Sequence, residues 1–155
     1  MADMDLTALT NELEHAAVAG GIAAILSGAP STIYALARGR DPLEGALAAG
    51  TLLLPRERRH ALLLPAATIV HLTLSIGWAL VLARTLPQRH LPTAATVAGL
   101  TIAALDLGLV GRRYPAIRAL PAAPQIADHL AYTWTVAAVL HRRRHAAPRH
   151  PVSAR

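Results

Sequence analysis

The chain has 155 residues, of which 54% are hydrophobic and 15% are charged, and its formal net charge is +6. Soluble proteins carry about 25% charged residues, so this composition indicates an integral membrane protein. The absence of cysteine excludes disulfides, thiol redox chemistry and thiolate metal sites. The basic residues are all arginine and cluster beside apolar runs, where they anchor helices and meet anionic lipid head groups rather than nucleic acid.

Four segments of the chain are nearly free of charged residues. A helix needs about 20 apolar residues to cross the hydrocarbon layer. By this criterion we predict four spans, with Asp106 inside the third and Asp128 at the entrance of the fourth, at about 15–37, 61–83, 93–111 and 126–141. The alternative is a soluble alanine-rich bundle, but residues 61–70 show no polar face, which every soluble helix needs.

The first predicted span has small residues at every fourth position, namely Gly20, Ala24 and Gly28. This spacing lets two helix backbones approach closely, so these residues are predicted to form a helix-packing face. Pro30 follows them and is expected to kink the last turns. The residues before this span are acidic and contain no arginine, unlike a signal peptide, so we expect the span to be retained.

A short helix is predicted between the first two spans, over about 42–54, with Asp41 as its N-cap. Its length is about 18 Å, too short to cross a bilayer, so it is expected to be interfacial or re-entrant. The predicted fold class is therefore an all-α integral membrane four-helix bundle with one extra short helix. The chain forms a single membrane domain over 1–155 that ends in a basic tail, 142–155.

The distribution of arginine does not settle the orientation. With four spans, seven arginines lie on the side that holds both termini and eight lie on the other, so the positive-inside rule does not choose between them. The dense basic tail favours cytoplasmic termini in the inner (plasma) membrane. The expected partners are the lipid bilayer, together with other membrane subunits or a second copy of the chain.

Polar residues interrupt three of the predicted spans. Helix lengths measured from the ends of the second and third spans place His71 level with Leu105, so Asp106 lies at a similar depth. The same alignment places the start of the fourth span in this layer. We therefore predict a buried polar cluster of His71, Ser75, Asp106, Asp128, His129 and Tyr132.

Several functions fit such a cluster. Ionisable groups inside a membrane are costly and usually functional, which favours a proton relay or a polar lining for a small solute. A metal site of His71, Asp106 and His129, or a haem between the two histidines, are alternatives. A purely structural role, in which hydrogen bonds hold the helices together, is a further one. No catalytic motif occurs in a soluble region, so neither an enzyme nor a bound cofactor is expected.

The second half of the chain resembles the YagU-like bacterial inner-membrane proteins, whose function is uncharacterised. The shared features are a span with His71 and Ser75, a small-residue span, a Pro-rich connection, and Asp128, His129 and Trp134 opening a last span before an arginine-rich end. The resemblance implies a multi-pass inner-membrane protein and directs attention to the two histidines.

Overall fold

The computed structural model describes residues 2–146, so Met1 and most of the predicted basic tail (147–155) lie outside the described part of the chain. The described residues are helical and include no strand. Two short segments continue the helix that ends at Leu105. The first, η1, is a wider π-helix (Asp106–Val110), and the second, η2, is a tighter 3-10 helix (Gly111–Arg113). The α-helices are α1 (Ala2–Leu26), α2 (Ala29–Ala37), α3 (Glu44–Gly50), α4 (His60–Thr85), α5 (Leu91–Leu105), α6 (Pro115–Arg118) and α7 (Ala122–Ala146).

Three helical segments of the described chain are long and apolar enough to cross a membrane by length and composition, namely Leu9–Ala37, His60–Thr85 and Leu91–Arg113. They correspond to the first three predicted spans. The helix α7 covers the fourth predicted span and is 25 residues long. It does not reach the same hydropathy, because polar and charged residues occupy both of its ends.

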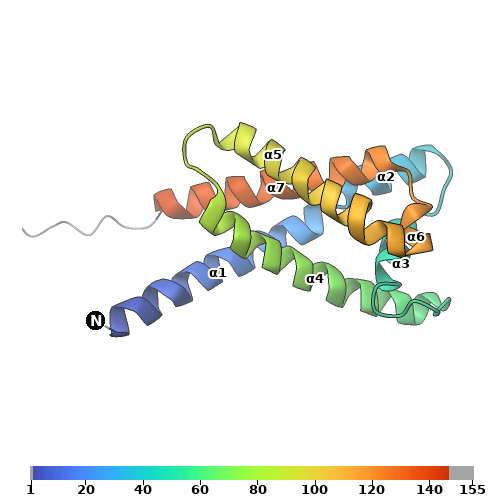
Figure 1. Ribbon diagram of the computed structural model, residues 1–155, viewed down its shortest axis with the longest axis horizontal. Coiled ribbons are helices and arrows are strands. Elements are labelled where there is room, and N and C mark those ends of the chain that lie inside the picture. The colour runs from blue at the N-terminus through green and yellow to red at the C-terminus, as the bar shows by residue number, and fades with distance from the viewer. Residues whose placement is uncertain (1, 147–155) are drawn as a thin grey trace, which may run out of the picture.

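The helices are arranged around α7, which packs against α5, α1 and α2 (Figure 1). The helix α4 packs chiefly on α1 and α3, and α5 packs chiefly on α7. The loop between α4 and α5 is short, but the two helices pack against different partners. The start of α1, the end of α7 and the α4–α5 loop lie together at what we call the terminal end, opposite α3 and α6 at the α3 end.

Two pairs of the long helices approach each other at glycines. A Cβ atom on Gly20 of α1 would lie 2.8 Å from the backbone oxygen of Ser75 in α4, and one on Gly99 of α5 would lie 2.6 Å from Oγ1 of Thr133 in α7. Backbones this close need a residue without a side chain. The predicted face is therefore used at Gly20, whereas a Cβ on Gly28 would meet nothing within 4 Å.

The break between α1 and α2 follows from Pro30. Proline has no N–H and its ring clashes with the carbonyl four residues earlier, which here belongs to Leu26, the last residue of α1. A two-residue turn follows, and α2 then begins at Ala29 with Pro30 in its first turn. The predicted kink is thus a full interruption of the helix, which leaves backbone groups without intrahelical partners on both sides.

The short predicted helix over 42–54 is confined to α3, Glu44–Gly50. The predicted N-cap, Asp41, is wrong, because Leu43 is the N-cap of α3; the carboxylate of Asp41 instead accepts a hydrogen bond from the N–H of Leu43 at 2.8 Å in the turn before the helix. Gly50 ends α3 against the backbone of Leu63 in α4. The helix α3 therefore covers the end of the bundle and packs mainly on α4.

Candidate polar site near the α3 end

Two of the predicted cluster residues satisfy the backbone groups that the α1–α2 break exposes. The ring Nε2–H of His71, on α4, donates to the carbonyl of Ala24 at 2.8 Å. Carbonyls of the last helical turn have no intrahelical partner, so this histidine caps the end of α1. Since a carbonyl only accepts, Nε2 of His71 carries the proton.

On the other side of the break, Asp128 of α7 caps the start of α2. Its Oδ1 accepts a hydrogen bond from the N–H of Ser31 at 2.9 Å. The Ser31 N–H is one of the unpaired donors in the first turn of α2, and the positive end of the helix dipole favours a carboxylate there. His71 and Asp128 thus hold one interruption of the first span from two other helices.

Asp106 and His129 form the one direct pair between ionisable side chains of the predicted cluster. Nε2 of His129, on α7, lies 3.1 Å from Oδ2 of Asp106, and the two side chains are 18% and 33% exposed. Nδ1 of the same ring lies 2.7 Å from the carbonyl oxygen of Gln125. The pair therefore joins α5 to α7 at the point where α5 changes to the π-helix η1.

The local geometry of η1 depends on Gly111, whose N–H donates to the carbonyl of Asp106, five residues earlier. A Cβ on Gly111 would lie 3.0 Å from that same carbonyl oxygen. Single π-turns inside helices occur often at functional sites, because the extra residue re-aims the side chains that follow or precede it. Here the wide turn begins at the residue that contacts His129.

The hydrogen bonds of His129 fix how many protons the pair holds. The Gln125 carbonyl only accepts, so Nδ1 carries a proton. The contact between Nε2 and Asp106 needs one more proton, which resides either on the ring or on the carboxyl group. In both forms the pair has no net charge, which lowers the cost of placing it among apolar helices.

Tyr132 and Ser75 join α7 to α4. The hydroxyl of Tyr132 donates to the backbone carbonyl of Ser75, and both residues are buried, with 6% and 4% of their surface exposed. Gly20 of α1 lies against the same carbonyl. Three helices therefore meet here, and the Tyr132 hydroxyl is bonded rather than free.

The structure brings Asp106 and His129 together and leaves His71 apart from them. His71 belongs to α4, which packs on α1, so its ring points to the end of α1 rather than to α5. Among the described residues no group of three His, Asp or Glu side chains is placed to hold a metal ion. The three residues of the predicted metal site, His71, Asp106 and His129, are therefore not brought together in this conformation.

The polar layer lies nearer to the α3 end than to the terminal end. His129 is seven residues from the start of α7 and thirteen from Arg142, which correspond to about 10 Å and about 20 Å of helix. Asp106 is likewise seven residues from Arg113, where η2 ends. The alignment from the ends of the predicted spans gave these residues a similar depth, and the helix bounds add that the Asp106–His129 pair lies nearer to the α3 end.

Sequence reasoning missed the backbone partners of the cluster and did not place Ser31 or Gln125 beside it. A signal for Ser31 was present, because a residue just after a proline that restarts a helix has an unpaired N–H. Nothing in the sequence pointed to Gln125, whose backbone carbonyl accepts from His129 and whose side chain lies beside α3. A Cβ on Gly45 of α3 would lie 3.9 Å from Nε2 of Gln125 and 3.9 Å from Oγ of Ser31.

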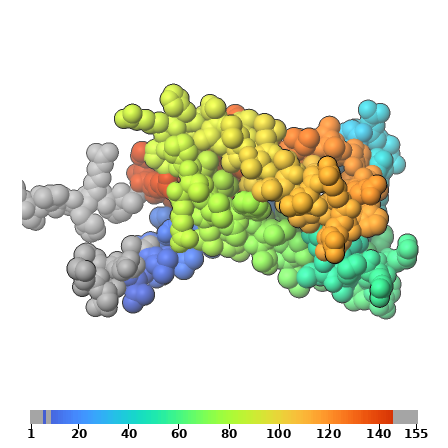
Figure 2. Space-filling view, viewed as in Figure 1, coloured from blue at the N-terminus to red at the C-terminus, as the bar shows by residue number. Residues whose placement is uncertain are grey.

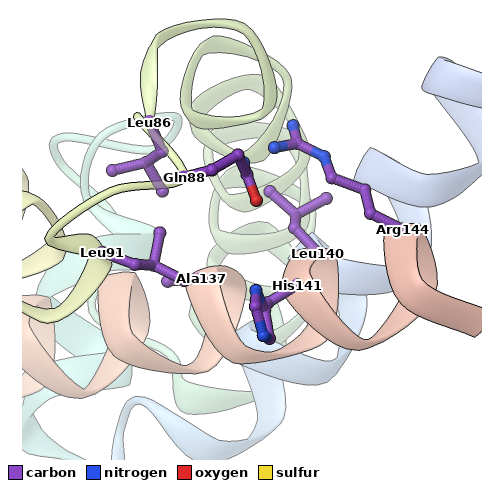
Figure 3. Close-up of a pocket in the computed structure, with 7 residues that line it drawn as sticks. All are labelled: Leu86, Gln88, Leu91, Ala137, Leu140, His141 and Arg144. Atoms are coloured by element: carbon purple, nitrogen blue, oxygen red, sulfur yellow. The ribbon is translucent and has the colours of Figure 1, made fainter.

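The terminal end is closed by apolar side chains. Figure 3 shows Leu86, Leu91, Ala137 and Leu140 gathered where the α4–α5 loop meets α7, with the polar groups of Gln88, His141 and Arg144 around them. No space for a water molecule remains between these residues. Ion pairs then tie α1 to its neighbours, from Arg84 to Glu12 at 2.7 Å and from Arg143 to Glu14 at 3.4 Å.

Comparisons with protein-family models, with curated proteins and with solved structures found no match to this chain.

Proposed function

We propose that this chain is a four-span protein of the bacterial inner membrane, with α7 as the fourth span, in which the Asp106–His129 pair takes up and releases a proton. The proposal includes cytoplasmic termini and no enzymatic reaction. Support for the fourth span comes from packing, since α7 lies against α5, α1 and α2 and its polar residues bond to those helices. The resemblance to YagU-like proteins agrees with a multi-pass membrane protein and stays a prediction.

The observation that carries this proposal is the contact of 3.1 Å between Nε2 of His129 and Oδ2 of Asp106, which needs one proton between the two atoms. If the shared proton leaves, the nitrogen lone pair faces a carboxylate and the contact becomes repulsive. If a second proton arrives, the ring is cationic and the carboxyl group is neutral. The contact between α5 and α7 therefore depends on the protonation state, which couples proton binding to helix packing.

Proton flux into vesicles tests this proposal. Vesicles that contain the protein and a trapped pH-sensitive dye are given a pH difference, and the wild type is compared with Asp106→Asn and His129→Gln. We expect flux above that of empty vesicles for the wild type and loss of most of it in both variants. Tyr132→Phe is the control, because it removes a buried hydroxyl of the same helix outside the pair.

Folding of every variant is checked by circular dichroism and gel filtration in mild detergent. Folded pair variants with wild-type flux, or a wild type no different from empty vesicles, would contradict proton handling.

A second candidate function is supported by the other polar contacts. His71, Asp128 and Tyr132 all bond to backbone groups, which holds helices together without any exchangeable proton between side chains. An accessory membrane subunit built this way would dock on a partner protein or on lipid. It is favoured if Asp106→Asn unfolds the protein while the folded wild type passes no protons.

A further inference from the structure

We propose that the Asp106–His129 pair exchanges protons with water on the α3 side of the membrane only, through an opening between α3 and the start of α7 that passes Gly45, Ser31 and Gln125. This inference rests on the proposed proton-handling function and adds the side and the route of access. The ionisable side chains of the layer are Asp106 from η1, His71 from α4, and Asp128, His129 and Tyr132 from α7. The facing parts of α1 and α2 contribute Ser27, Ser31 and backbone carbonyls.

The first observation is the distribution of space around the layer. An open depression of about 370 Å³ lies at the α3 end, between α3, the segment before α4, and α6. Figure 2 shows the surfaces of α3 and α6 adjoining at that end of the molecule. The lining of the depression includes charged side chains that bind water, namely Arg40, Asp41, Glu44, Glu57 and Arg58.

The second observation is the looseness of the cover between this depression and the polar layer. The helix α3 has seven residues, and one face of it, with Glu44 and Ala48, lines the depression. Gly45 faces the other way: a Cβ added there would lie 3.9 Å from the side chains of Gln125 and Ser31, and the glycine leaves that position empty. The helix α3 packs mainly on α4, and α7 is not among its main partners. Few interactions therefore hold the side of α3 that faces α7.

The third observation is that the two residues next to Gly45 bind the polar layer through their backbones, Gln125 at His129 of the pair and Ser31 at Asp128. Gln125 supplies the carbonyl that receives Nδ1–H of His129 at 2.7 Å, and Ser31 supplies the N–H that binds Asp128 at 2.9 Å. Amide and hydroxyl groups at these positions offer hydrogen bonds to a short file of water. Asp106 is 33% exposed and about 10 Å of helix from Arg113, so its carboxyl group lies within reach of interfacial water on the same side.

The fourth observation is that the opposite direction is blocked. Between the layer and the terminal end lies a core of buried apolar residues from α1, α4, α5 and α7, which includes Ala79, Ile102, Val136 and Leu140. Val136 is fully buried. Voids lined by such residues stay dry, so they offer protons no path.

The absence of cysteine from the chain allows a test by thiol labelling. Single-cysteine variants in membrane vesicles are treated from one side or the other with a charged, membrane-impermeant methanethiosulfonate. Ala119→Cys, which lines the depression, marks the α3 side, and Gln88→Cys in the α4–α5 loop marks the terminal side. The reporters are Gln125→Cys and, as a second position, Ser31→Cys, and the closed-side control is Ala137→Cys.

We expect Gln125→Cys and Ser31→Cys to be modified from the side that modifies Ala119→Cys, and Ala137→Cys to resist the reagent from both sides. Adding Gly45→Leu should abolish labelling at 125, because a larger side chain fills the space next to Gln125 and Ser31. Adding Ala46→Leu, on the exposed face of α3, should leave it unchanged.

Protection of both reporters from the α3 side, or their labelling from the Gln88 side, overturns the one-sided route. Labelling at 125 that survives Gly45→Leu overturns the path past Gly45. These results are independent of proton flux, so the route fails or stands separately from the proposed function.

Discussion

At the terminal end, the bundle consists of alanines, leucines and a valine packed without room for water, whereas at the α3 end the helices are interrupted, short or wide and carry the polar layer. The first arrangement lets α1 and α4 approach at Gly20 and fixes their distance. The second has a helix break at 27–28 and a π-turn at Asp106, and side chains of neighbouring helices satisfy the freed backbone groups. Regular packing holds the helices at fixed distances here, and its interruptions expose backbone groups that polar side chains of other helices bind.

The largest effect on stability is expected in the closely packed half, at the contact between α1 and α4. Gly20→Ala should lower the free energy of unfolding by about 1–3 kcal/mol, because the new Cβ would lie 2.8 Å from the Ser75 oxygen and 2.9 Å from Cα of Ile76. Gly21→Ala is the matched control on the next residue, where a Cβ meets nothing within 4 Å. Denaturant unfolding in mild detergent measures both, and equal stability of the two variants would contradict the close approach.

In the interrupted half, Asp128→Ala should cost about 1–3 kcal/mol, because it leaves the Ser31 N–H without its partner inside the bundle. Asp128→Asn keeps an oxygen acceptor and should recover most of that loss. Hydrogen exchange at the Ser31 amide, followed by NMR, reports the cap directly. An unchanged exchange rate in Asp128→Ala would show that the carboxylate does not hold the start of α2.

The smallest effect is expected at the surface of the α3 end. The side chain of Arg59, followed by the N–H groups of Arg59 and Arg58, holds the pKa of Glu57 at about 2, below its ordinary value of 4.5. Its contribution to stability is therefore present above the ordinary pKa and is lost as pH falls toward 2. Arg59→Gln should raise the pKa of Glu57 toward 4.5, as measured from the NMR shift of its carboxyl carbon against pH.

Arg58→Gln is the control for this titration, because it retains the Arg58 backbone N–H that bonds to Glu57. A Glu57 midpoint near 4.5 in the wild type would refute the ion pair with Arg59. Since the Arg59 side chain is 74% exposed, solvent screens this ion pair, and we expect only a small change in the free energy of unfolding from Arg59→Gln.

Much of the helical content was predictable because its causes are local. Charge-free runs gave the first three long apolar segments, and Pro30 gave the break after α1. The π-turn at Asp106 was not predictable, since no proline lies within it. The four-span arrangement itself stays a prediction, because α7 has lower hydropathy than the other three segments.

The candidate site was predictable as a set of residues and much less so as a set of contacts. Asp106 and His129 were expected near each other from helix lengths alone, and they bond. His71 was expected to join them. However, α4 packs on α1, and the His71 ring caps the end of α1 instead. Depth along a helix follows from residue counting, whereas the direction in which a side chain points depends on which helices become neighbours.

The state of the His129 ring tests the central claim most directly. ¹⁵N NMR of ring-labelled histidine in detergent-solubilised protein, with His129→Gln to assign the signal, reports each nitrogen as pH is varied. We predict that Nδ1 stays protonated throughout, held by the Gln125 carbonyl, while the Nε2 shift changes with pH and this change is altered in Asp106→Asn. A His129 ring whose two nitrogens titrate together, as in a free imidazole, or whose Nε2 signal is the same with and without Asp106, would contradict a proton shared between these two side chains.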